Sequence, residues 1–202
     1  MPGPFVRREG EGVRLGGPAI GLIETTSIAR GIVVADAMVK RAVVTLALAR
    51  PVTPGKHVVI VTGEVGEVEE AMAAGVGAAA HTLVDRLYLP QAHPTLLAAL
   101  ASGCQAPVVE ALGIVETFTV AATLLGADAA CKAAEVALCE LRLADGLGGK
   151  AYFVLTAELD LVEAAVSAVE RVLESGLLLT REIIARPHAD LLAALGVGEG
   201  AR

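Results

Sequence analysis

The chain contains one pattern of residues twice, about 92 positions apart. Segment 20–50 pairs without a gap with segment 112–142, and about 12 of the 31 paired positions are identical. The matches include Glu, Thr, Asp, Lys and Arg, which are not the abundant residues here, so shared composition does not explain them. The two endings also match, as AHPTLLAAL at 92–100 and PHADLLAAL at 187–195. This tandem duplication constrains the fold, because each copy has to form the same small domain.

Each copy has the hydrophobic pattern of four strands, two helices and a short final helix. In the first helix, for example, Ile28, Ile32, Ala35 and Val39 recur at the helical period. We expect strands at 19–25, 43–49, 57–62, 83–89, 112–117, 136–143, 150–156 and 177–185, and helices after Ser27, from Glu64, at 93–100, at 120–135, from Leu159 and at 187–195.

The order β-α-β-β-α-β in each copy predicts an α+β fold, an α/β sandwich of the ferredoxin-like split β-α-β type. In such a fold the helices cover one face of a single sheet.

The positions of the two repeats set the expected domain boundaries. We expect a flexible tail at 1–18, a first domain at 19–100, a linker at 101–109, a second domain at 110–196 and a tail at 197–202.

The composition excludes several classes of function. Hydrophobic residues make up 54% of the chain and charged residues 19%, yet no apolar run reaches the roughly 18–20 residues that a membrane span needs. The high apolar content therefore points to extensive burial that includes subunit interfaces. The net charge of −7, without a basic stripe, argues against nucleic acid and against an anionic membrane surface as partners.

The three cysteines show no CxxC motif and no histidine at metal-ligand spacing, so reduced thiols are expected. Cys131 and Cys139 occupy the positions of Val39 and Ala47 in the first copy. Both replace small apolar residues, which favours a core-packing role. We expect no metal site and no cofactor.

Several short motifs occur in the same order in both copies. They are Gly-x-x-Glu-Thr at 21–25 and 113–117, Ala-Asp-Ala-x-x-Lys ending at Lys40 and Lys132, and a Gly-Lys hairpin at 55–56 and 149–150. The second copy closes on Ile-Ala-Arg-Pro-His from Ile184. With these motifs, nearly all of 19–195 resembles the bacterial microcompartment shell domain. Two such domains on one chain resemble the tandem-domain shell proteins, most closely the single-layer trimers with pseudo-sixfold symmetry.

The resemblance implies a structural protein and not an enzyme. It implies a homotrimeric tile in the shell of a microcompartment in the bacterial cytoplasm, with a central pore for small polar metabolites. Hexameric and pentameric shell proteins of the same compartment are then the expected partners.

The resemblance also implies that the two hairpin turns line the pore. Glycines suit this place because they adopt positive φ and allow a close approach to a symmetry axis. Ordinary solvent-facing turns are the alternative, and Asp145 is either a pore carboxylate or a simple Asp-Gly turn residue. Neither turn contains a cysteine, so we expect no iron–sulfur cluster of the kind that some tandem shell proteins hold there. The expected pore residues are Thr53, Pro54, Gly55, Asp145, Gly146, Leu147, Gly148 and Gly149.

At the tile edge, the resemblance places Lys40 and Lys132, with Arg186 as a companion. Solvated lysines at helix C-termini are the simpler alternative. The first copy has Gln91 where the second has Arg186, so half of the edges are expected to differ. The repeated His93 and His188 lack other metal ligands nearby, which favours a capping or edge-packing role.

Two other functions remain open from the residues alone. One is a small-molecule sensor of ferredoxin-like fold that binds a ligand between the copies. The other is an enzyme that uses Glu24 or Glu116 as a base, although no nucleophile, P-loop or GxGxxG motif accompanies them.

Overall fold

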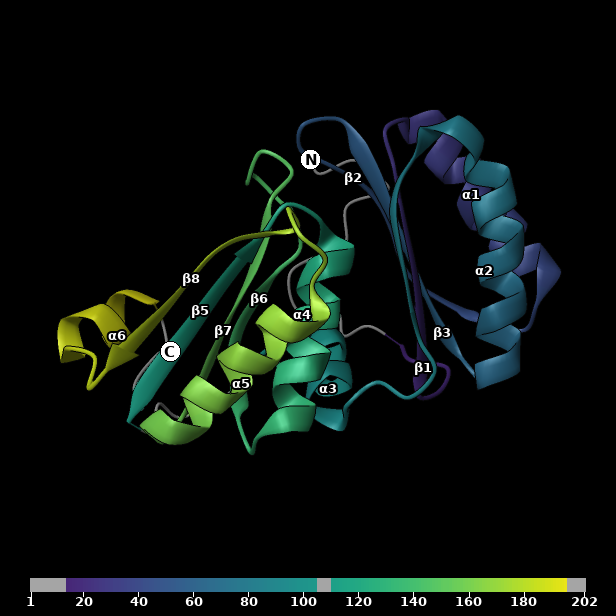
Figure 1. Ribbon diagram of the computed structural model, residues 1–202. Helices are drawn as coiled ribbons and strands as arrows, with labels where there is room; N and C mark the ends of the chain where they lie inside the picture. The colour runs from purple at the N-terminus through teal and green to yellow at the C-terminus, as the bar shows by residue number, and fades with distance from the viewer. Residues whose placement is uncertain (1–13, 105–109, 196–202) are drawn as a thin grey trace. The chain divides into compact units, whose positions relative to one another are not determined.

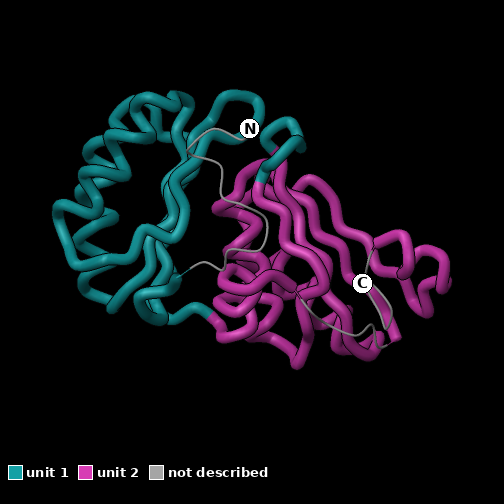
Figure 2. Tube along the Cα trace, turned by 180° about the vertical axis from the view of Figure 1, so that it is seen from behind, with its two compact units in different colours: residues 1–92, 144–149 teal, residues 93–143, 150–202 magenta. Residues whose placement is uncertain are grey.

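The computed structural model describes residues 14–104 and 110–195 (Figure 1). The chain divides into two compact units (Figure 2). Unit 1 runs to Ala92 and also includes segment 144–149, and unit 2 comprises the other described residues from His93 onward. The short helix that ends the first copy thus belongs to unit 2, and the long hairpin turn of the second copy belongs to unit 1.

Unit 1 is a four-stranded antiparallel sheet with strand order β2-β3-β1-β4. Helices α1 and α2 cover one face of it (Figure 1). The elements are β1 (Ala19–Thr25), α1 (Ile28–Arg41), β2 (Thr45–Val52), β3 (Lys56–Gly63), α2 (Val65–Ala79), a 3-10 turn η1 (Ala80–Thr82) and β4 (Leu83–Leu89).

Unit 2 repeats this plan with strand order β6-β7-β5-β8. It begins with the helix that ends the first copy. The elements are α3 (Pro94–Ser102), β5 (Ala111–Thr117), α4 (Val120–Ala133), β6 (Ala137–Arg142), β7 (Ala151–Ala157), α5 (Leu159–Val172), β8 (Leu178–Ala185) and α6 (Ala189–Leu195). Two tandem α+β domains with the expected order of elements are therefore confirmed.

The first hairpin turn is shorter than the sequence suggested. Pro51 and Val52 belong to β2, where they pair with His57 and Lys56, so the expected end of this strand at residue 49 is wrong. Proline is compatible with this strand because β2 lies at the edge of the sheet and needs only one row of ladder hydrogen bonds. The turn itself is reduced to residues 53–55.

The two units fill the same core with different side chains. In unit 1, the buried His57 packs against Gly31 of α1, and a Cβ atom at residue 31 would clash with its ring. In unit 2, the equivalent positions hold the buried Thr123 and Ala151. A large residue on the strand faces a small one on the helix in one unit, and the sizes are reversed in the other.

The crossing of the two long helices shows the same exchange. Gly75 of α2 lies against Met38 of α1, and an added Cβ would lie 2.7 Å from the Met38 side chain. In unit 2, Val169 takes the place of Gly75, and the small residue is Gly126 of α4 instead. The copies have diverged in sequence while keeping the interior filled.

Replacing Gly31 with Ala is expected to lower the free energy of unfolding by about 1–3 kcal/mol, because the new methyl group overlaps the His57 ring. Urea denaturation at a fixed protein concentration measures this loss. The double variant Gly31→Ala/His57→Ala should lose less than the sum of its two single variants. Gly77→Ala is the matched control, since nothing lies within 4 Å of that helical position; an equal loss there would contradict the account.

Candidate functional site

The two hairpin turns lie together in unit 1. Gly55, Gly146, Gly148 and Gly149 all have positive φ, at 115°, 70°, 63° and 90°. A Cβ atom at Gly149 would lie 3.0 Å from the ring of Pro54. Glycine is therefore required at residue 149 both by its backbone conformation and by the close approach of the other turn.

The turns are also joined by charge. Arg50 Nη1 lies 2.7 Å from Asp145 Oδ2, and Lys56 Nζ donates to the carbonyl oxygen of Gly149 over 3.5 Å. The Asp145 side chain is 60% exposed, so this ion pair contributes at most about 1 kcal/mol after solvent screening. Asp145 is thus a paired residue that orients the longer turn. We did not single out Arg50 from the sequence, although its identity with Arg142 in the second copy was a visible signal.

Glu24 and Glu116, the candidate catalytic bases, each form an ion pair with a lysine of the hairpin in the same copy. Glu24 lies 3.6 Å from Lys56 Nζ, and Glu116 lies 3.0 Å from Lys150 Nζ. The lysines occupy equivalent positions in the two hairpins. The same pairing in both copies of the domain favours a structural role for both carboxylates.

The candidate edge lysines sit at the ends of equivalent helices but in different surroundings. Each forms an i,i+4 pair over 2.6 Å, Lys40 with Asp36 and Lys132 with Asp128. The Asp36 side chain is 55% exposed, whereas that of Asp128 is 5% exposed. Asp128 is buried because it also accepts a hydrogen bond of 2.7 Å from the backbone N–H of His93, just before α3.

The helices that end the two copies differ in the same way. His93 is the N-cap of α3, where its Nδ1 accepts a hydrogen bond from Thr95 N, and α3 contacts α4 and β6 with Leu96 buried. In the second copy, His188 Nδ1 accepts from Asp190 N, but α6 buries none of its residues. The first copy of the terminal helix thus buries a leucine against α4 and β6, whereas in the second copy Leu192 packs only partly buried against the cluster of Leu112, Cys139 and Val154.

A large apolar face of α1 is exposed as well. Ile28 and Ile32 are 41% and 59% exposed, while the equivalent Val120 and Leu124 of α4 are fully buried. Val39, the third large residue of the stripe expected from the helical period, is also exposed; α1 faces the core through Gly31, Val34, Ala35 and Met38 instead. The helix was predicted correctly, but three of the four stripe residues lie on a surface and not in the core of the unit.

The remaining edge candidate lies on the surface of unit 2. Arg186 is exposed with a positive φ of 49°, and its backbone N–H donates to the carbonyl oxygen of Glu110 over 2.8 Å. This bond fixes the chain direction between β8 and α6 and leaves the guanidinium group outside.

The surroundings of the three cysteine thiols disfavour the thiolate form. Burial, followed by neighbouring thiol and carboxyl groups, raises the pKa of Cys104 to about 11 and that of Cys131 to about 12. Burial, followed by Glu140, raises the pKa of Cys139 to about 11. Over the described ranges 14–104 and 110–195, no group of three or more His, Cys, Asp or Glu residues is arranged to hold a metal ion. Across the same ranges, none of the helices combines the length and the apolar character that crossing a membrane requires.

The chain matches known proteins over most of its length. The BMC domain family model matches twice, at residues 19–92 and 111–187. The bacterial microcompartment shell protein PduT of Citrobacter freundii is 42% identical over 174 residues, which cover 86% of this chain and 95% of PduT. The carboxysome shell protein CcmK2 of Thermosynechococcus vestitus is 46% identical over 61 residues, which cover 30% of this chain and 60% of CcmK2. A crystal structure of a microcompartment protein from Desulfitobacterium hafniense superposes with a TM-score of 0.79 at 41% identity, over 87% of this chain and 98% of that one.

The fold and the duplicated hairpins thus define a protein built from two BMC domains in tandem. The chain belongs to the BMC-domain family of bacterial microcompartment shell proteins, and its role is structural. The resemblance in the sequence is confirmed, and the sensor function finds no support among these relatives.

We expect the cysteines of the native protein to react slowly with iodoacetamide. A pKa of about 11 in place of 9.0 lowers the thiolate fraction near pH 8 about 100-fold, and the thiolate is the reactive form. Mass spectrometry should show little labelling in buffer and three labels per chain in urea. Rapid labelling of native Cys104, the least buried of the three, would contradict these surroundings.

Proposed function

We propose that this shell protein closes into a ring of three chains, a pseudohexagonal tile with a narrow central pore that passes small polar metabolites. Six BMC domains then alternate around the ring, first copy and second copy in turn. The unequal burial of equivalent surfaces in the two copies carries this proposal.

The surface that lacks a cover on unit 1 has a covered counterpart on unit 2. On unit 2, α3 lies on α4 and β6, and Asp128 receives the His93 N–H. On unit 1, the corresponding surface of α1 and β2 presents Ile28, Ile32 and an exposed Asp36. The matching helix, α6, has no fully buried residue, although its Leu192 packs partly buried against the sheet of unit 2. A second chain that places α6 on α1 repeats the arrangement of α3 on α4.

This contact is heterologous, because it joins one surface of a chain to a different surface of the next. Heterologous contacts produce closed rings when the rotation closes and filaments when it does not. The presence of two similar domains in each chain supports a closed ring. Three chains then supply the six domains of a pseudohexagonal ring.

The paired turns supply the proposed pore lining, which comprises Thr53, Pro54, Gly55 and residues 145–149. The short and long turns alternate around the axis. Asp145 is paired with Arg50, so its charge is already balanced within the chain. Exposed backbone N–H groups at the glycines offer hydrogen bonds to polar solutes.

The tile edge is the place proposed for Lys40, Lys132 and Arg186, whereas a capping role is proposed for His93 and His188. Lys40 and Arg186 are exposed, which supports contacts with neighbouring tiles. Gln91 in place of an arginine makes alternate edges different, so hexameric and pentameric shell proteins of the same compartment are the proposed neighbours. The shell of a compartment in the bacterial cytoplasm is the corresponding location.

Ile32→Asp and Leu191→Asp should each break the ring, because each places a carboxylate in one half of the apolar contact. Light scattering should report about three times the 20.5 kDa chain mass for the native protein and a single chain for each variant. A 1:1 mixture of the two variants should form a dimer, since an intact α6 then meets an intact α1. That recovery is possible only for a heterologous contact.

Val172→Asp is the matched control, because this exposed apolar residue of α5 lies outside both proposed surfaces. It should leave the ring intact. A native protein that stays a single chain at high concentration would contradict the ring, and so would a mixture of the two variants that does not associate.

A further inference from the structure

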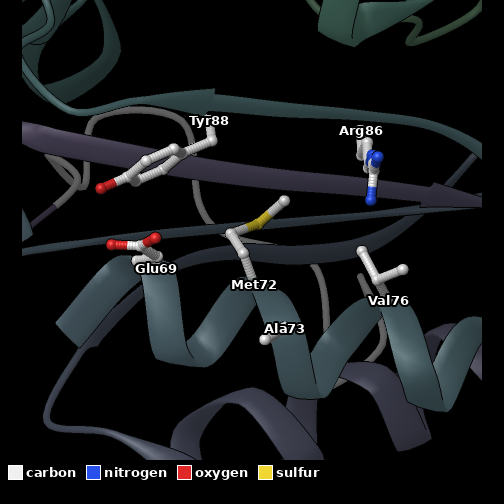
Figure 3. A pocket seen from close by; sticks show the side chains of 6 residues that line it. All are labelled: Glu69, Met72, Ala73, Val76, Arg86 and Tyr88. Atoms are coloured by element: carbon white, nitrogen blue, oxygen red, sulfur yellow. The ribbon is translucent and has the colours of Figure 1, made fainter. Parts of the chain in front are cut away.

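Unit 1 has a groove of about 370 Å³ between α2 and the edge strand β4. Figure 3 shows the six side chains that line it, which are Glu69, Met72, Ala73, Val76, Arg86 and Tyr88. All six residues belong to α2 and β4, so the groove shares no residue with the hairpin turns or with the exposed face of α1. The proposal for it does not depend on the ring.

The groove has a charge at each end and an apolar floor. The Arg86 guanidinium group points into one end beside Val76, and the Glu69 carboxylate lies below the Tyr88 hydroxyl at the other (Figure 3). Met72 and Ala73 lie between them. The Tyr88 hydroxyl donates to the carbonyl oxygen of Val65 over 3.0 Å, and desolvation, followed by Glu69, raises the pKa of Tyr88.

The second copy shows what occupies the equivalent place. Arg86 pairs with Ile23 of β1, and Arg181 pairs with the corresponding Val115 of β5, so the two arginines are equivalent. Arg181 Nε lies 2.5 Å from the Glu170 carboxylate of α5. In α2, Val76 stands where α5 has Glu170.

The first copy therefore keeps the arginine, as Arg86, but has Val76 in place of the carboxylate of Glu170. In the described part of the chain, no carboxylate forms an ion pair with the Arg86 guanidinium group. The substitution also replaces a polar side chain with Val76, which extends the apolar floor towards Arg86. Among the residues that the structure describes, none supplies an anion at this place.

We propose that this groove binds a short aliphatic monocarboxylate. Its carboxylate takes the position that Glu170 holds in unit 2 and pairs with Arg86, and its alkyl chain covers Val76 and Met72. Charge-assisted hydrogen bonds from a guanidinium group to a carboxylate are stronger than neutral ones. Glu69 repels a second carboxylate at the far end, so dicarboxylates bind less well. Since Arg86 is exposed and screened, a dissociation constant on the order of millimolar is expected.

Methionine methyl groups report on the groove directly. Met72 lies in its floor, and Met38 is fully buried in the core of the same unit as an internal reference. Full-length protein with 13C-labelled methionine methyls is titrated with sodium butyrate at constant ionic strength, and the Met72→Leu variant assigns the signals. The Met72 signal should shift in a saturable way while the Met38 signal stays. Succinate and butylamine should each give a response at least about 10-fold weaker.

The chain provides its own matched variants. Arg86→Gln should remove the saturable shift, and Val76→Glu should remove it by supplying the internal carboxylate of unit 2. The reciprocal change, Glu170→Val together with Val166→Met as a reporter, should create a second responding methyl group, whereas Val166→Met alone should not.

A Met72 shift that persists at full size in Arg86→Gln would overturn the proposal, and so would no shift in the native protein. Equal responses to butyrate and succinate would also overturn it, because they would mean that Glu69 sets no selectivity. Light scattering of the same samples reports the assembly state, so a failure of the ring and a failure of the groove are separate results.

Discussion

The Asp128 carboxylate accepts hydrogen bonds from two donors, the Lys132 ammonium group on its own helix and the backbone N–H of His93. The second of these comes from the end of the first copy and fixes where α3 begins. Burying a carboxylate costs free energy unless hydrogen bonds or an ion pair replace its contacts with water. Here the ion pair with Lys132 and the hydrogen bond from His93 replace them. The docking of α3 on unit 2 depends on this residue, and so does the contrast with the exposed Asp36.

The same contrast explains the distribution of apolar surface. A chain with 54% hydrophobic residues and about 200 residues cannot bury all of them in two small cores. Ile28 and Ile32 remain 41% and 59% exposed, and burying this remaining surface contributes about 1 kcal/mol for each side chain. An association that covers α1 therefore has a driving force that does not rely on the charged edge residues. In this account, the apolar contact holds the chains of one tile together, and the lysines serve contacts between tiles.

Much of this architecture could be predicted from the sequence because the repeat gives every position a partner. The order of elements, the glycines of the turns and the histidine caps follow from local patterns. The face of α1 that points into the core does not follow from local patterns. A helix with two apolar stripes shows the same period on both, so only the packing shows that Val34 and Met38 face the core. The pairing of Asp145 with Arg50 and the opening beside Arg86 were also beyond reach. The first depends on a contact between the turns of the two copies, and the second on the packing of Val76 beside Arg86 within the first copy.

A cryo-electron microscopy structure of the assembled full-length protein would test the central claim most directly. The account predicts three chains around a central opening, with the Asp36 carboxylate of one chain accepting a hydrogen bond from the His188 N–H of the next, and with Ile28 and Ile32 covered by α6. It also predicts short and long turns in alternation around the opening. An assembly in which α6 lies elsewhere and the α1 face remains open to solvent would contradict it.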